Sequence, residues 1–202
     1  MHACRSLFAA LALGLSLLSR PLLATTVEPP SLDSLVGQSD YVVRAVVKST
    51  TPSWQEYEGR RYIRTAIELE VREVIKGTPP SPLVLDLVGG KIGEDELVIE
   101  GMPKFHVGDE HVLFVHGKER KLIPLVALMH GVYPVMREAR SGQAYVLRSN
   151  GRPLYSADEV ATPMSETSSI KRQNPLASPL TVGAFISQIR QRSLNRTTSR
   201  EK

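Results

Sequence analysis

The sequence predicts a mainly β protein, a small closed or partly open β-barrel with a short N-terminal helix and a C-terminal amphipathic helix. Residues 61–77 alternate apolar and polar side chains with the period of two that is typical of a strand with one buried face. Between Tyr41 and Asn150, about eight short segments rich in β-branched residues are separated by turn residues, with no helical pattern among them. This combination favours a barrel or sandwich.

Residues 1–24 have the features of a cleavable secretory signal. Arg5 gives a positive start, and the apolar run Leu7–Leu18 is too short to span a hydrocarbon layer of about 30 Å. The small residue Ala24 offers a cleavage point. The only cysteine, Cys4, lies in this segment, so we expect a mature chain without disulfides, a cysteine nucleophile or thiolate metal ligands.

Export without cysteines favours the bacterial periplasm or an extracellular location. The charge is unevenly distributed along the chain. Residues 25–164 carry 16 basic and 19 acidic residues, whereas residues 165–202 carry 7 basic and 2 acidic residues. The folded part is therefore mildly acidic, and nucleic acid is not an expected partner.

Residues 25–39 are predicted to form a lead segment with one short helix. Ser31 can cap this helix, and its apolar residues share one face: Leu32, Leu35 and Val36. Residues 40–150 form the predicted barrel domain. In it, the strand that begins at Tyr41 is expected to end at Thr50, because Thr51-Pro52 stops it and a polar loop begins at Pro52. The alternation of the next strand fails at Glu73, which predicts a β-bulge or sharp bend.

The C-terminal part divides into three predicted segments. Residues 151–177 are polar and contain several prolines and serines, so we expect a flexible linker. Residues 178–194 are predicted to form an amphipathic helix capped by Ser178, with an apolar stripe made of Val182, Phe185, Ile186 and Ile189. Residues 195–202 are expected to be a disordered basic tail.

The predicted polar loop after Pro52 supplies the candidate binding residues. They are Trp54, the only tryptophan, and its neighbours Tyr57, Arg60 and Arg61. Tryptophan, tyrosine and arginine are the residue types enriched in binding hot spots. The alternative is that Trp54 only closes the end of the barrel, and both interpretations stay open.

Four histidines of the mature chain are candidate metal ligands: His106, His111, His116 and His130. A catalytic zinc ion needs three protein ligands around one point. On a regular strand that begins near Glu110, His111 and His116 lie on opposite faces and do not converge. We therefore expect no metal, no cofactor and no catalytic residues, and we keep a metal-dependent hydrolase that also uses Asp109 or Glu110 as the alternative.

Several short motifs carry a resemblance between Ser31 and Val135. They are "SLDSLVGQSDYVVRAVV", "LEVREVIKG", "LVGGKIG", "GMPKFHVGDEHVLFV" and "MHGVYPV". In this order they resemble a group of small exported bacterial domains of unassigned function. The layout is also remotely similar to the oligonucleotide-binding-like (OB-like) barrel of netrin modules and tissue inhibitors of metalloproteinases. Those inhibitors bind the protease zinc through an N-terminal cysteine, which the mature chain lacks, so the resemblance implies a fold and no mechanism.

Three functional hypotheses follow. The preferred one is a non-catalytic exported binding or structural module with a protein or polymer partner in the bacterial cell envelope. The second is the metal-dependent hydrolase of the His106–His116 region. The third is a binder of polyanions or of a membrane surface through the basic C-terminal helix.

Overall fold

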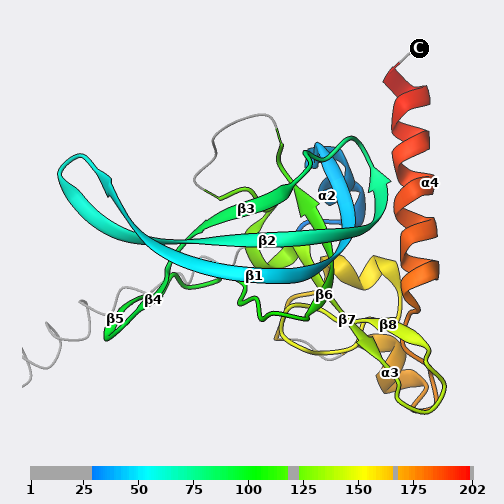
Figure 1. Ribbon diagram of the computed structural model, residues 1–202. Coiled ribbons are helices and arrows are strands. Elements are labelled where there is room, and N and C mark those ends of the chain that lie inside the picture. The colour runs from blue at the N-terminus through cyan, green and yellow to red at the C-terminus, as the bar shows by residue number, and fades with distance from the viewer. Residues whose placement is uncertain (1–28, 118–122, 166–167, 201–202) are drawn as a thin grey trace, which may run out of the picture.

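A computed structural model describes residues 29–117, 123–165 and 168–200 of the protein (Figure 1). Strands predominate, which confirms the predicted mainly β class. The predicted signal, residues 1–24, lies outside the described residues. The elements follow in the order α2 (Leu32–Gln38), β1 (Tyr41–Tyr57), β2 (Arg60–Lys76), β3 (Leu83–Val88), β4 (Gly90–Ile92), β5 (Asp95–Leu97), β6 (Glu110–Val115), the 3₁₀ helix η1 (Leu128–Gly131), β7 (Val132–Arg137), β8 (Ala144–Val146), the 3₁₀ helix η2 (Ala157–Ala161), α3 (Ser169–Gln173) and α4 (Val182–Arg200).

Six strands form one antiparallel sheet in the order β3-β2-β1-β6-β7-β8. The short strands β4 and β5 form a separate hairpin. The large sheet is strongly curved, as Figure 1 shows. Within the described residues, no backbone ladder joins its outer strands β3 and β8, so the partly open form of the predicted barrel is the one observed.

The prediction of a polar loop at Pro52 was wrong. The chain continues there as part of β1, so the first two strands are much longer than expected. Beyond Lys48 the ladder of β1 runs only along β2, so Pro52 lies where its missing N–H interrupts no second ladder. The two strands meet in a two-residue turn, Glu58-Gly59, whose φ angles are 52° and 73°. We call residues 50–67 the hairpin arm, and Figure 1 shows it reaching beyond the rest of the sheet.

The bend predicted at Glu73 is confirmed as two register shifts between β1 and β2. They leave Arg72 and Ile75 without a partner residue on β1, one on each side of Glu73. A shift of one residue exchanges the faces of a strand. Ile75 therefore packs with Val42 in one hydrophobic cluster, whereas Ile67 packs in the other.

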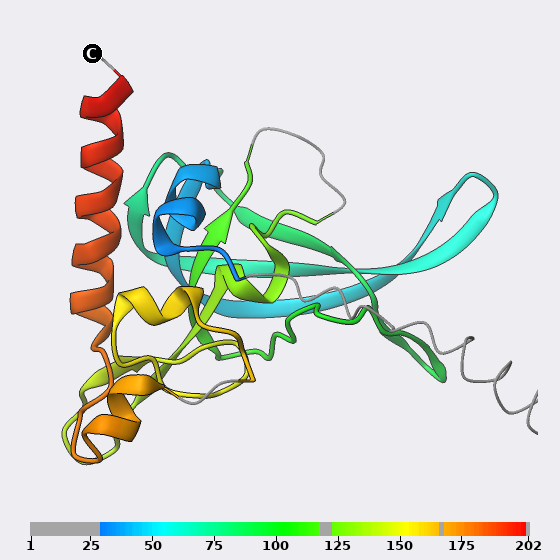
Figure 2. The same cartoon turned by 180° about the vertical axis from the view of Figure 1, so that it is seen from behind.

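The two faces of the sheet have separate hydrophobic cores. One core lies between the sheet and the helices α2, η2 and α4, and its largest fully buried members are Phe114, Phe185, Leu35, Leu154 and Ile189. The other lies inside the curve of β1, β2, β3 and β6 and includes Val43, Ile67, Leu85 and Leu113. Figure 2 shows α4 beside α2 along one side of the molecule.

The α2 helix forms as predicted, because the side chain of Ser31 accepts a hydrogen bond from Ser34 N at 3.1 Å. Residues 151–177, in contrast, differ from the expected flexible linker. Leu154, Ala157 and Val160 are buried in the helix-side core, and Leu154 N donates to Val146 O at 3.0 Å. A few isolated apolar residues anchor this segment, although its average composition is polar.

The apolar stripe of α4 is buried as predicted: Val182, Phe185, Ile186 and Ile189 all belong to the helix-side core. The predicted cap was wrong, since Thr181 Oγ1, and not Ser178, accepts a hydrogen bond from Ala184 N at 3.2 Å. The disordered basic tail was also wrong for residues 195–200, because the helix continues to Arg200, and residues 201–202 lie outside the described residues. One contact that holds this end is the bond from Arg196 Nη1 to Asp33 O at 2.6 Å. Among the described residues, no helix has the length and apolar character needed to cross a membrane.

Candidate functional site

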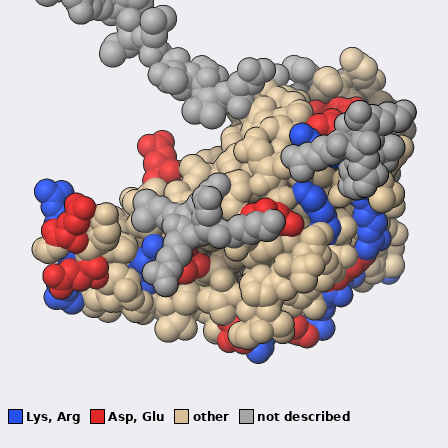
Figure 3. Space-filling model, turned by 90° about the horizontal axis from the view of Figure 1, so that it is seen from above, with Lys and Arg blue, Asp and Glu red and all other residues tan. Residues whose placement is uncertain are grey.

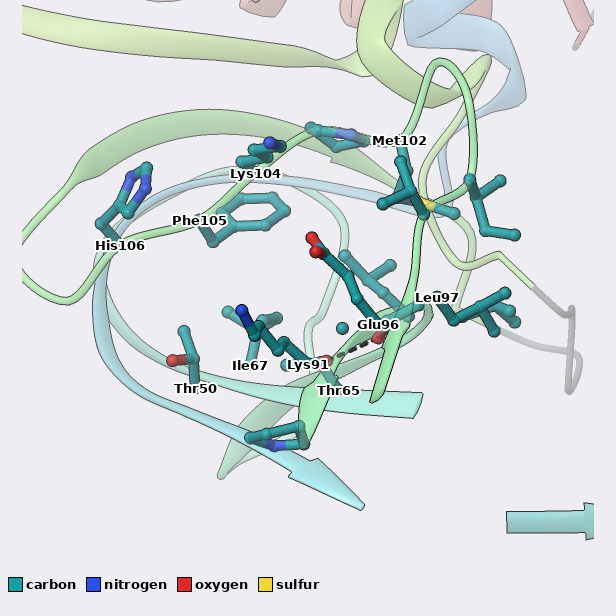
Figure 4. A pocket seen from close by; sticks show the side chains of 18 residues that line it. Thr50, Thr65, Ile67, Lys91, Glu96, Leu97, Met102, Lys104, Phe105 and His106 are labelled. Carbon is teal, nitrogen blue, oxygen red and sulfur yellow. Dashed lines mark hydrogen bonds between the residues drawn. The ribbon is translucent and has the colours of Figure 1, made fainter. Parts of the chain in front are cut away.

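A pocket of about 360 Å³ lies between the hairpin arm, the β4–β5 hairpin and residues 102–106 (Figure 4). We call it pocket A. Its lining is mainly apolar, and charged side chains of the β4–β5 hairpin and residue 104 extend over it. The apolar lining includes Ile67, Leu87, Leu97, Met102 and Phe105, and the charged residues are Lys91, Glu96 and Lys104.

A glycine pair allows the β4–β5 hairpin to close one side of pocket A. Gly89 and Gly90 have φ angles of 109° and 138°, which other residues rarely adopt. Gly89 N donates to Ile63 O at 2.8 Å, and Thr65 Oγ1 donates to Gly89 O at 2.6 Å. A Cβ atom on Gly90 would lie 2.2 Å from Thr65 Oγ1. The close approach to the arm therefore requires glycine at position 90.

The register of the hairpin arm places Trp54 and Arg61 on the same face as pocket A. Thr50 pairs with Ile67, and both line the pocket. Directly paired residues share a face, and alternate residues along a strand share a face. Trp54, four residues after Thr50, and Arg61, six residues before Ile67, therefore continue the lining of pocket A toward the tip of the arm.

Tyr57 and Arg60, the other two candidate binding residues, lie on the opposite face of the arm. They pair with each other next to the turn, one position out of phase with Trp54 and Arg61. The tip carries both signs of charge, and Figure 3 shows basic and acidic side chains side by side at this end of the molecule. The structure thus separates the four predicted residues into two pairs.

Trp54 and Arg61 are in direct contact. The guanidinium carbon of Arg61 lies 4.5 Å from the centroid of the Trp54 ring, within the range of a cation–π interaction. Trp54 is 37% exposed and Tyr57 is 67% exposed. Trp54 belongs to neither hydrophobic core and lies on the arm, not at the end of the curved sheet.

The candidate metal ligands lie in different environments. His106 is exposed, and its Nδ1 lies 3.1 Å from Asp109 Oδ2. His111 is buried in β6, with its ring edge-to-face on Phe105 at 5.1 Å between centroids. His116 follows the end of β6, and His130 lies in η1.

Within the described ranges, no three His, Cys, Asp or Glu residues are grouped so that they could hold a metal ion. Alternation along β6 also separates the faces as predicted, because Leu113 and Val115 lie in one core and Val112 and Phe114 in the other. The carboxylate of Glu110 is bound by two arginines, Arg44 at 2.5 Å and Arg137 at 3.0 Å. These ion pairs give Glu110 a role in holding β1, β6 and β7 together.

Burial gives two of the histidines unusual proton affinities. It lowers the pKa of His111 from its ordinary value of 6.5 to about 4, while the nearby carboxylates of Asp109 and Glu110 act in the opposite direction. Burial also lowers the pKa of His130, and the charge of Arg148 acts in the same direction. His111 is therefore a neutral imidazole at neutral pH.

Most of pocket A was missed by the sequence reasoning. The sequence indicates only turns and short strands in the segments that contain Lys91, Glu96 and Lys104. The available signals were Gly89-Gly90, which marks a close backbone approach, and Glu58-Gly59 between two alternating segments, which marks a tight hairpin. Both signals are visible in the sequence, but neither indicates which other strands border the pocket.

Comparison with known proteins finds no family that matches the chain and no curated protein of significantly similar sequence. The resemblance to small exported bacterial domains, and to netrin and tissue-inhibitor barrels, therefore remains an expectation.

Proposed function

We propose that the protein is a non-catalytic binding module of the bacterial cell envelope that holds an extended segment of a protein partner. The segment lies along pocket A and the adjoining face of Trp54 and Arg61. The observation that carries this proposal is the continuity of the two surfaces, since Thr50 and Pro52 line the pocket and Trp54 is the next residue on the same face.

The length of this surface favours an extended ligand over a compact one. Pocket A, at about 360 Å³, lies near the lower end of the range of small-molecule sites and is large enough for an apolar side chain. The face continues for four residues from Thr50 to Trp54, about 14 Å at the rise of an antiparallel strand. Trp54 lies two residues beyond Pro52, about 7 Å along the strand, so a polypeptide that inserts a side chain into the pocket can also contact Trp54.

The chemistry of the surface favours a polypeptide over a polyanion. The lining of the pocket is mainly apolar, and its charged residues, Lys91, Glu96 and Lys104, are of both signs. The indole of Trp54 and the guanidinium of Arg61 provide apolar contact and hydrogen-bond donors, the combination found in protein-binding hot spots.

The third hypothesis, a polyanion or lipid surface bound by the C-terminal helix, is less well supported. Two of its arginines bind acidic residues of the same chain: Arg190 pairs with Glu73 at 2.8 Å, and Arg192 pairs with Asp158 at 3.0 Å. The apolar stripe of the helix is buried in the core. Binding a membrane would require these contacts to open.

A selected peptide tests the proposal. A phage-displayed library of short random peptides is panned on the immobilised mature protein, and enriched peptides are titrated calorimetrically. We expect the double variant Trp54→Ala/Arg61→Ala to lose at least about tenfold in affinity. The matched control is Tyr57→Ala/Arg60→Ala, which also removes one aromatic residue and one arginine, but from the opposite face, and should bind like the unaltered protein. Equal losses in both variants, or no loss in the first, would refute the proposed site.

A further inference from the structure

One side of β1 in the hairpin arm carries backbone groups that no neighbouring strand uses. β6 pairs with the start of β1, and the turn before β6 ends this contact at Val47. Val47 N donates to Asp109 O, and Gly108 N donates to Val47 O, both at 2.9 Å. Beyond this turn β1 pairs with β2 on one side, and the described part of the chain forms no ladder on the other side. We call this side of residues 50–56 the free edge.

The turn at the tip of the arm shows which residues point to the free edge. Tyr57 and Arg60 enclose a two-residue turn with positive φ at both central residues, so they form a hydrogen-bonded pair. Hydrogen-bonded and non-hydrogen-bonded pairs alternate along an antiparallel ladder. Trp54 and Ile63 therefore form a non-hydrogen-bonded pair, and the carbonyl of Ile63 turns away from β1 to accept from Gly89 N at 2.8 Å. The backbone N–H and C=O of Trp54 accordingly point to the free edge.

The same alternation applies along the whole free edge, because the register is regular from Ser49 to the tip. Thr50, Pro52 and Glu56 lie an even number of residues from Trp54, so their backbone groups also point outward. Pro52 has no N–H, so it contributes an acceptor and no donor. Residues 51–57 are exposed, and the edge is therefore open to a second chain.

We propose that the partner segment binds as an added β-strand along the free edge, in the position that β6 would occupy if it extended past Gly108. This inference rests on the function proposed above. It adds that the arm recognises the backbone of the partner as well as its side chains.

An added strand is the ligand that complements this edge, because its own backbone donors and acceptors match the outward groups of β1. Its alternate side chains lie beside Thr50 and Trp54 on the face of pocket A. Figure 4 shows Thr50 and Phe105 on opposite sides of the pocket, so the partner side chain next to Thr50 is placed to enter it. Backbone pairing and insertion into pocket A are therefore compatible in one ligand.

Pro52 favours a strand of another protein over a second copy of this chain. In a two-fold antiparallel pair of arms Pro52 would occur twice, so the ladder would lack two donors, whereas a strand of different sequence meets Pro52 once. Proline on an exposed edge also discourages identical edges from pairing. Thr50, Trp54 and Glu56 keep their outward donors for a partner.

Amide hydrogen exchange tests the inference directly. It is measured by NMR on the ¹⁵N-labelled protein, alone and saturated with a peptide enriched from the random library. The outward amides of Trp54 and Glu56 should exchange rapidly in the free protein and at least about tenfold more slowly in the complex. The amides of Ser53 and Gln55, which donate to β2, should be protected in both states. Unchanged exchange of Trp54 and Glu56 in the saturated complex would overturn the inference.

A substitution that supplies the missing donor gives an independent test. Pro52→Val adds an N–H to the free edge and keeps an apolar side chain beside pocket A, so we expect the peptide to bind about two- to tenfold more tightly. The matched control is Thr50→Val, which changes a side chain on the same face without adding a donor and should give no gain. Equal affinities of the two variants would contradict backbone pairing at this edge.

The outcomes separate this inference from the proposed function. If no selected peptide binds, both fail. If a peptide binds and loses affinity in Trp54→Ala/Arg61→Ala, but the outward amides stay unprotected, only the added strand is refuted. Protection of Trp54 and Glu56 that rises with protein concentration in the absence of peptide would assign the free edge to a second copy and would also overturn the inference.

Discussion

The guanidinium group of Arg61 stacks over the ring of Trp54, 4.5 Å from its centroid, although the two residues come from opposite strands of the hairpin arm. Their contact orients two candidate binding side chains on the face that leads to pocket A. It also places the only tryptophan of the chain at the proposed contact surface, where its fluorescence can report binding.

Arg61→Ala should change the emission of Trp54 and cause only a small loss of stability. A cation–π contact at an exposed site contributes about 0.5–1 kcal/mol, so we expect a decrease of that size in the free energy of unfolding. Fluorescence spectra and urea denaturation measure the two effects. Arg60→Ala, on the opposite face, is the control and should leave the emission unchanged.

His111→Phe should flatten the dependence of stability on pH between about 6.5 and 4. In this range the unfolded chain protonates His111 and the folded protein does not, because burial lowers its pKa to about 4. The free energy of unfolding therefore falls as the pH falls through this window, by up to about 3 kcal/mol for this residue.

Thermal denaturation of both proteins at several pH values measures this effect. Asp109, Glu110 and His106, the charged neighbours of His111, are present in both, so the difference between the two curves isolates the imidazole. Parallel curves across the window would show that His111 gains a proton as readily in the folded protein as in the unfolded chain.

Phe185→Ala should destabilise the protein by about 3–5 kcal/mol, because Phe185 is fully buried against Phe114 and Tyr133. Arg190→Ala removes a partly exposed ion pair from the same helix and should cost less than about 1 kcal/mol. Chemical denaturation compares the two variants. Similar small losses would mean that α4 is not part of the core.

Gly90→Ala should be more harmful than Gly142→Ala, although both glycines have positive φ. At Gly142 nothing lies within 4 Å of an added Cβ, so only the backbone strain of about 1–2 kcal/mol applies. At Gly90 the added atom would also lie 2.2 Å from Thr65 Oγ1. Thermal melting ranks the two variants, and equal losses would contradict the close contact at pocket A.

Export can be tested at the N-terminus. Expressed with residues 1–24 in a Gram-negative host, the protein should be recovered from the periplasm with Thr25 as its first residue. Cell fractionation and mass spectrometry of the intact chain measure both outcomes. Recovery in the cytoplasm with residues 1–24 still attached would contradict export.

Local patterns predicted the elements that depend on neighbours in the sequence. The alternation of residues 61–77 revealed β2, Ser31 revealed the start of α2, and the apolar stripe of α4 was recognised from its spacing. In each case the signal comes from residues that are close together in the sequence.

Features that depend on distant contacts were not predictable in the same way. Pro52 suggested the end of a strand, because proline cannot donate to a ladder. The neighbouring residues do not show that β1 pairs on only one side at this point. The polar composition of residues 151–177 hid the burial of Leu154 and Val160. The candidate site was predictable to the same extent. Residue type identified Trp54 and Arg61 as candidates. Only the register of the arm shows that Tyr57 and Arg60 lie on the opposite face.

The most direct test of the proposed binding surface is a set of intermolecular nuclear Overhauser effects between a selected peptide and the methyl groups of the protein. We expect effects at Ile67 and Leu87, which line pocket A, and none at Val84, which is exposed on the opposite face of β3. Effects at Val84 without any at Ile67 or Leu87 would show that the peptide binds elsewhere and would contradict the account.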